Sequence, residues 1–150
     1  MSATRIRRIL VPTDFSDGAL HAARYALGVA KDLGASLTLL HAYVPPVSPY
    51  LPGASFAPTE AVLDEVERSV DRDLERLCGL LATEGVEITS KKVLGTDSET
   101  IAKVAKEDGF DLVVMGTHGR TGWRHLILGS IAEEVVRSSE VPVLTVRHPR

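Results

Sequence analysis

Residues 111–116 read DLVVMG, and they run into the loop THGRTGWRHLILG at 117–129 and then into SIAEEVV at 130–136. The first part is almost wholly apolar, which is typical of a strand that a parallel sheet buries on both faces. The last part has its apolar residues at helical spacing, namely Ile131, Ala132, Val135 and Val136. Ser130 and Glu133 fit a capping box, which predicts that Ser130 is the N-cap. The stretch therefore predicts a buried strand, a loop containing glycines and a helix.

The rest of the chain repeats this alternation. Apolar or β-branched runs predict further strands, one ending in 9–11 and closed by Pro12, the others at 35–42, 86–93 and 142–146. Helical spacing predicts helices at 16–33 and 59–84, and a third opened by a capping box of Thr96 and Glu99. Ser16 is the predicted N-cap of the first helix and Gly34 its C-terminal stop. The predicted buried stripe of the longest helix consists of Val62, Val66, Val70, Leu74, Leu77 and Leu81.

Strands and helices in this order predict an α/β fold, with a mostly parallel sheet covered by helices on both faces. Right-handed crossovers and short connections favour a five-stranded, doubly wound sheet in the order 3-2-1-4-5. We expect one domain, residues 1–150. Ligands of such sheets bind outside the carboxyl ends of the strands, where the direction of growth reverses. That point lies between strands 1 and 4, so PTDFS at 12–16 and GTHG at 116–119 are the candidate segments.

Composition and charge limit the kinds of molecule that the protein is expected to bind. The 150 residues carry a formal net charge of −3, whereas nucleic-acid binders usually have a strong basic excess. No stretch approaches the ~20 apolar residues that span a bilayer, and the apolar run near Met1 is too short for a signal-peptide core. The single cysteine, Cys78, fits a reducing compartment. We therefore expect a cytoplasmic protein that binds neither nucleic acid nor membrane.

The loop after the fourth predicted strand has the composition of an anion site. Its glycines permit positive φ and a close approach of the backbone to a ligand; they are Gly116, Gly119 and Gly122. Between Gly116 and Ser130 there is no acid, and the basic and histidine residues are His118, Arg120, Arg124 and His125. The loop leads into a predicted helix N-terminus, where N–H groups and the helix dipole favour phosphate. His118 and Arg120 are candidate phosphate contacts.

Common nucleotide motifs are absent. The sequence has no GxxxxGK[ST], so it lacks a P-loop lysine. No GxGxxG follows the first strand, which argues against an NAD- or FAD-type site. The histidines have no metal-ligand spacing with one another or with Cys78.

Gly116, Gly119, Gly129 and Ser130 have the spacing G-x2-G-x9-G-S. This matches the signature G-x2-G-x9-G-[ST], and through it the chain resembles the ATP-binding branch of the universal stress protein family. The resemblance covers the whole chain, including ILVPTDFS at 9–16, LTLLHA at 37–42, LVVMGTHG at 112–119 and VPVLTVR at 141–147. It implies a Rossmann-like fold of the adenine nucleotide alpha hydrolase-like kind, bound ATP, and a homodimer formed through the last strand.

The resemblance also implies roles for particular residues. Those against the adenosine are Pro12, Thr13, Asp14 and Ala42. Those that form the floor of the nucleotide pocket are Met115 and Gly116. Those around the ribose and phosphates are Gly119, Gly129, Ser130 and Ile131. A Mg²⁺ ion would arrive with the nucleotide, held mainly by phosphates and water.

Some residues keep two interpretations. Ser130 is a helix cap, a phosphate contact or both, and Asp14 is a turn residue or a ribose contact. His41, on a buried strand, is interpreted as a core histidine with its hydrogen bonds satisfied. Residues 44–58 hold five of the eight prolines and form either a surface loop or a functional segment, which would be a lid or a contact for a protein partner. The segment Val141–Val146 is apolar on both faces at a predicted sheet edge, which a twofold dimer would cover.

These features favour a nucleotide-dependent stress-response binder that acts through a dimer. The second hypothesis is an enzyme, either a slow ATPase or a nucleotide phosphotransferase. However, the sequence shows no recognisable pair of a nucleophilic side chain and the base that would activate it. Asp14 is the best-placed acid for activating water, and the ribose would occupy it. The third hypothesis is an interaction module that holds AMP or a cyclic nucleotide.

Overall fold

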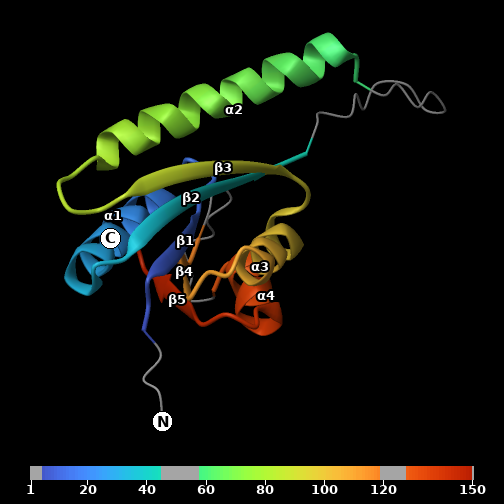
Figure 1. Cartoon of the computed structure of the whole chain (residues 1–150). Coiled ribbons are helices and arrows are strands. Elements are labelled where there is room, and N and C mark those ends of the chain that lie inside the picture. The colour runs from blue at the N-terminus through green and yellow to red at the C-terminus, as the bar shows by residue number, and fades with distance from the viewer. Residues whose placement is uncertain (1–4, 45–57, 119–127, 150) are drawn as a thin grey trace.

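The computed structural model describes residues 5–44, 58–118 and 128–149, and it contains a sheet with helices on both faces (Figure 1). The strands are β1 (Arg8–Pro12), β2 (Ser36–Tyr43), β3 (Ile88–Leu94), β4 (Leu112–Gly116) and β5 (Val143–Val146). Neighbouring strands pair in parallel, and their order is β3-β2-β1-β4-β5. The predicted fold class and strand order are confirmed.

Two helices cover each face of the sheet. They are α1 (Asp17–Leu33), α2 (Glu60–Leu81), α3 (Asp97–Glu107) and α4 (Ser130–Ser138). Ile9 and Val11 of β1 pack with α1 and α2, whereas Leu10 packs with α3 and α4. Successive side chains of a strand point to opposite faces, so a strand buried on both sides is apolar throughout. None of the helices in the described ranges is long and apolar enough to cross a membrane.

Helix α1 begins and ends where the sequence predicts. The Ser16 side chain accepts a hydrogen bond from the Ala19 amide, and Gly34 ends the helix at φ 64°. This left-handed conformation suits glycine because it has no Cβ. Four alanines of α1 are completely buried, so the helix lies close against the sheet beside the end of β4.

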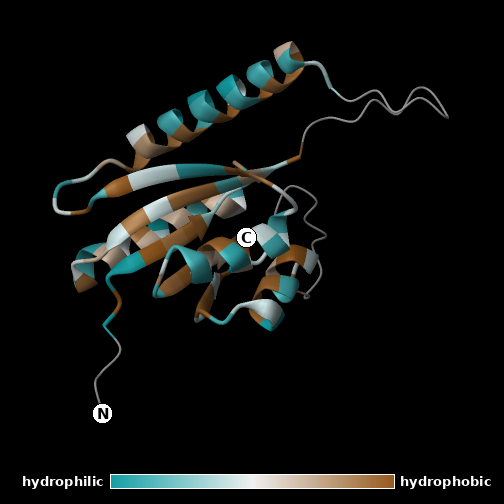
Figure 2. Cartoon of the chain, turned by 45° about the vertical axis from the view of Figure 1, so that its right-hand side comes forward, coloured by the Kyte–Doolittle hydropathy of each residue, from teal (hydrophilic) through white to brown (hydrophobic). Residues whose placement is uncertain are grey.

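Helix α2 packs through only part of the predicted stripe. Val70, Leu74, Leu77 and Leu81 are buried, whereas Val62 is 42% exposed. The first turns of the helix diverge from the sheet, and its outer face is hydrophilic (Figures 1 and 2). The helix also ends at Leu81 rather than at residue 84. The prediction was therefore right for the start of α2 and for the centre of its buried stripe, and wrong for the burial of Val62 and for the last residue of the helix.

Both predicted capping boxes are wrong in their hydrogen bonding. Thr96 is the N-cap of α3, but its side chain makes no capping bond. The N-cap of α4 is Gly129 instead of Ser130. The Gly129 amide donates to the carbonyl oxygen of Thr117 at 2.7 Å, and this bond to the chain leaving β4 sets where the helix begins. Glu133 accepts from Arg137 at 2.8 Å rather than capping the helix.

Candidate functional site

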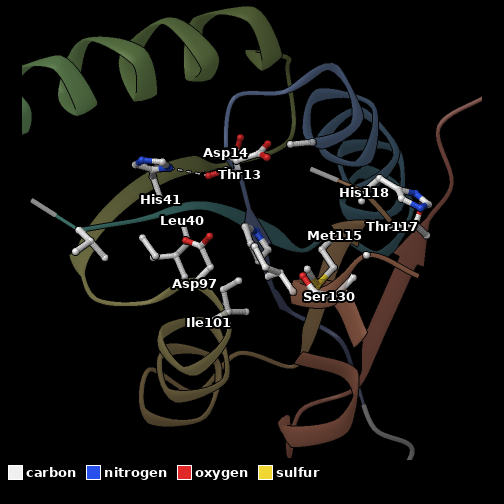
Figure 3. Close-up of a pocket in the computed structure, with 18 residues that line it drawn as sticks. Thr13, Asp14, Leu40, His41, Asp97, Ile101, Met115, Thr117, His118 and Ser130 are labelled. Atoms are coloured by element: carbon white, nitrogen blue, oxygen red, sulfur yellow. Dashed lines mark hydrogen bonds between the residues drawn. The ribbon is translucent and has the colours of Figure 1, made fainter. Parts of the chain in front are cut away.

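A pocket of about 420 Å³ lies at the carboxyl ends of β1, β2 and β4 (Figure 3). This is the edge and the reversal point at which ligands of such sheets bind. Its volume lies within the range of small-molecule sites. The lining residues come from the ends of these strands, the turn after β1, and the starts of α3 and α4.

The turn after β1 is fixed by its own hydrogen bonds. The Thr13 amide donates to the Leu40 carbonyl oxygen at 2.8 Å, which holds the turn against β2. The Phe15 amide donates to the Thr13 hydroxyl at 3.0 Å, and the Ser16 amide donates to Asp14 Oδ1 at 3.0 Å. Phe15 has a φ of 62°, which is uncommon for a residue other than glycine. Asp14 is thus a turn residue that also lines the pocket.

His41 joins this turn to β2. Its Nδ1 lies 2.8 Å from the Thr13 carbonyl oxygen, which only accepts, so Nδ1 carries the hydrogen. The ring packs against Phe15 with centroids 4.6 Å apart. His41 is therefore satisfied, as the sequence suggested, but it also lines the pocket.

The start of α4 presents hydrogen-bond donors to the pocket. The first bond within the helix runs from the Glu133 amide to the Gly129 carbonyl oxygen. The amides of Ser130, Ile131 and Ala132 precede it and have no acceptor inside the helix, and all three residues line the pocket. Together with the positive end of the helix dipole, these donors favour an anion here.

His118 contributes a further polar group on this side. Its Nδ1 lies 2.9 Å from the Thr117 hydroxyl. Its Nε2 is buried and has no hydrogen-bond partner among the described residues. Since buried polar atoms are nearly always paired, this nitrogen of a pocket-lining residue is a polar atom that a ligand or a water would satisfy.

Asp97 is an acid of the pocket that the sequence did not predict. It is the first residue of α3 and is exposed at the pocket rim. Loss of solvent raises the pKa of its carboxyl above the ordinary value; the charge of His41 opposes this rise and that of Asp14 adds to it. Among residues 5–44, 58–118 and 128–149, the Asp97 carboxylate has no hydrogen bond or ion pair.

The universal stress protein family model matches residues 5–147. The chain belongs to the universal stress protein family. Universal stress protein MJ0531 of Methanocaldococcus jannaschii is 32% identical over 144 residues, covering 96% of this chain and 84% of that protein. The structure of MJ0577 from the same organism has a TM-score of 0.78 at 25% identity, covering 97% of this chain and 99% of that one. A universal stress protein in complex with cAMP has a TM-score of 0.68 at 25% identity, covering 95% and 97%.

The structure brings most of the predicted site residues of this universal stress protein to one pocket. Those that line it are Pro12, Thr13, Asp14, Ala42, Met115, Gly116, His118, Gly129, Ser130 and Ile131. Gly119 and Arg120 lie outside the described residues, as does nearly all of the proline-containing segment at 44–58. Lining residues that sequence reasoning missed include Leu40, His41, Val44, Asp97 and Ile101. Asp97 follows the carboxyl end of a strand, and that position was the signal that could have found it.

Two glycines of the signature, Gly116 and Gly129, also have a packing role that the sequence did not predict. Gly116 and Gly129 do not have positive φ. A Cβ at Gly116 would lie 3.0 Å from the Gly18 carbonyl oxygen, and one at Gly129 would lie 2.7 Å from that of Thr117. Both glycines therefore allow backbone segments of the universal stress protein to pack closely around the pocket.

Proposed function

We propose that this chain binds ATP in the pocket at the carboxyl ends of β1, β2 and β4. The observation that carries this proposal is that the pocket has two chemically different ends. Amide donors at the start of α4 suit phosphates, whereas Leu40, Val44 and Ile101 at the other end suit a base. These residues fit an adenine nucleotide, since they supply an anion site and an apolar surface in one cavity.

Each predicted site residue then has a task in this proposal. Pro12 and Thr13 lie against the adenosine. Asp14 accepts a hydrogen bond from a ribose hydroxyl, and the backbone of Ala42 meets the edge of the adenine. Met115 and Gly116 form the floor. The residues proposed around the phosphates are His118, Gly119, Arg120, Gly129, Ser130 and Ile131. Among the described residues, no group of three or more histidine, cysteine or acidic side chains is gathered for a metal, so Mg²⁺ would be held mainly by the phosphates and water.

We further propose that the protein is a cytoplasmic stress-response regulator that signals nucleotide occupancy through a homodimer. Its last strand, β5, is an edge of the sheet. Val143 and Leu144 of this edge are only partly buried, and an apolar edge strand is ready to pair with a second chain. A twofold contact between two copies of β5 would cover it.

Titration calorimetry with ATP tests the nucleotide site. The Ser130→Ala variant removes a pocket-lining hydroxyl that makes no capping bond, so we expect ATP affinity to fall by about tenfold with stability preserved. Ser138→Ala, at the far end of the same helix, is the matched control and should bind as the wild type does. No binding of ATP at millimolar concentration by the wild type would contradict the proposal.

AMP or a cyclic adenine nucleotide is the second candidate ligand. It is favoured by the related universal stress protein whose structure is a complex with cAMP. The same calorimetry with AMP and cAMP separates the two candidates, because only ATP places three phosphoryl groups near the α4 donors. Binding of ATP no tighter than that of cAMP would favour the second candidate.

A further inference from the structure

The polar and charged side chains of the pocket are unevenly distributed. Thr117, His118 and Ser130 lie on the side of β4 and α4, whereas Asp97 lies on the other side with Leu40 and Ile101 (Figure 3). Asp14 is close enough to Asp97 for their charges to interact. One half of the pocket is therefore rich in donors, whereas Asp97 places a carboxylate in the other half.

This distribution fixes the direction of a bound nucleotide. A polyphosphate beside Asp97 and Asp14 would suffer like-charge repulsion, whereas the α4 amides attract it. The base then occupies the half lined by Leu40, Val44 and Ile101. Asp97 is one helical turn before Ile101, so its carboxylate stands at the rim of the apolar surface.

The Asp97 carboxylate at the rim of the pocket is available to accept a hydrogen bond from a ligand. An ionised carboxylate only accepts hydrogen bonds, and Asp97 has no partner in the described part of the chain. Because loss of solvent already raises the pKa of this group, a donor from the ligand would stabilise its ionised form. Adenine carries an exocyclic amino group that donates, whereas hypoxanthine carries a carbonyl oxygen at the same place.

We propose that Asp97 selects the base by accepting a hydrogen bond from its exocyclic amino group, so that the pocket prefers adenine to hypoxanthine. This inference rests on the proposed nucleotide site. A hypoxanthine nucleotide would set its carbonyl oxygen against the carboxylate, leaving two acceptors face to face without a hydrogen. Asp97 is a specificity residue in this account, and the phosphates are bound without it.

The experiment compares ATP and ITP in calorimetric titrations of the wild type, Asp97→Asn and Glu99→Gln. Asparagine both donates and accepts, so Asp97→Asn should tolerate either base. Glu99 lies in the same first turn of α3 and carries the same charge, but it does not line the pocket. We expect the wild type and Glu99→Gln to prefer ATP by about tenfold, and Asp97→Asn to prefer it by less than about threefold.

The other outcomes overturn the inference in distinguishable ways. If the wild type binds neither ATP nor ITP, the proposed nucleotide site fails and the inference fails with it. If it binds both equally, the site stands and base selection by Asp97 is wrong. If Asp97→Asn weakens both nucleotides equally, the contact is with a part that they share. If Glu99→Gln loses the preference as well, charge at the helix start is responsible. Thermal unfolding of each variant confirms that it is folded.

Discussion

The backbone amide of Gly129 donates to the carbonyl oxygen of Thr117 at 2.7 Å, and a Cβ added at Gly129 would lie 2.7 Å from that same oxygen. The hydrogen bond of residue 129 thus joins the start of α4 to the end of β4. The two backbone segments are so close there that a side chain would not fit between them. The same Cβ would lie 3.5 Å from the His118 Cα. This glycine is needed for the folded backbone before any ligand is considered.

Gly129→Ala should therefore destabilise the protein as well as weaken nucleotide binding. We expect a loss of about 1–3 kcal/mol in the free energy of unfolding, because backbone must move to admit the methyl group. Gly79→Ala is the control: Gly79 lies in α2 with nothing within 4 Å of its Cβ position. That variant should gain up to about 1 kcal/mol from helix propensity. Denaturant unfolding measures both, and an unchanged stability for Gly129→Ala would show that the junction adapts.

The two halves of α2 should differ in their sensitivity to truncation. Leu74 is buried against the sheet, whereas Val62 is exposed on the first turns. We expect Leu74→Ala to lower the free energy of unfolding by about 2–4 kcal/mol, and Val62→Ala to change it by less than about 0.5 kcal/mol. Equal losses in chemical denaturation would mean that the first turns of α2 are covered in solution.

Most of the architecture could be predicted from the sequence because the separate signals for strands, helices and turns agree with one another. Apolar runs, helical stripes and the turn after β1 all indicate the same alternating order, and right-handed crossovers leave few topologies. The caps of α1 were predictable because Ser16 and Gly34 act within their own helix. The start of α4 was not, since the Gly129–Thr117 bond joins segments 12 residues apart and overrides a local capping signal.

The candidate site was predictable to the extent that strand ends share one edge of the sheet. Asp14 follows β1 and Gly116 is the last residue of the neighbouring strand β4, so the topology brings them to the same edge of the sheet. His41 was assigned to the core because the apolar pattern of a buried strand does not show which of its residues lie at the carboxyl edge of the sheet. Asp97 was not singled out in the sequence, where only Thr96 and Glu99 were interpreted as a capping box, and its place in the pocket depends on how α3 packs beside β2.

At neutral pH, a variant that lacks the Asp97 charge should have a higher free energy of unfolding than a variant that lacks the Glu99 charge. The folded pKa of Asp97 is raised from 3.8, mainly by loss of solvent, with His41 opposing and Asp14 adding to the rise. A raised pKa favours the folded state below the unfolded value, and this advantage is lost as pH rises through the folded value. Wild-type protein at pH 7 therefore carries an unfavourable charge at Asp97.

Asp97→Asn removes that charge, and Glu99→Gln removes an equivalent interaction with the dipole of α3. We expect Asp97→Asn to be the more stable of the two at pH 7 by a few tenths of a kcal/mol, at most about 0.5, since Asp97 is exposed. The difference should narrow toward acid pH, as the Asp97 carboxyl that remains in Glu99→Gln takes up a proton. Thermal melts across this range measure it, and a gap that widens toward acid would contradict the sign.

The proposed dimer can be tested at one backbone amide of β5. The Val113 and Thr117 amides donate to the carbonyl oxygens of Pro142 and Val146, so alternate residues of β5 face β4 and the amide of Thr145 faces outward. Thr145→Pro removes this outward donor and leaves the pairing with β4 intact, because an edge strand tolerates proline on its free side. Thr145→Val keeps the donor and serves as the control.

We expect light scattering to give twice the chain mass of 16.2 kDa for the wild type and Thr145→Val, and a shift toward the single-chain mass for Thr145→Pro. Circular dichroism should show that the proline variant stays folded, because each hydrogen bond from β4 to β5 is retained. A wild type that runs as a monomer at all concentrations would exclude the dimer. A Thr145→Pro variant that remains dimeric would move the interface away from β5, since strand pairing at that edge requires the amide that proline lacks.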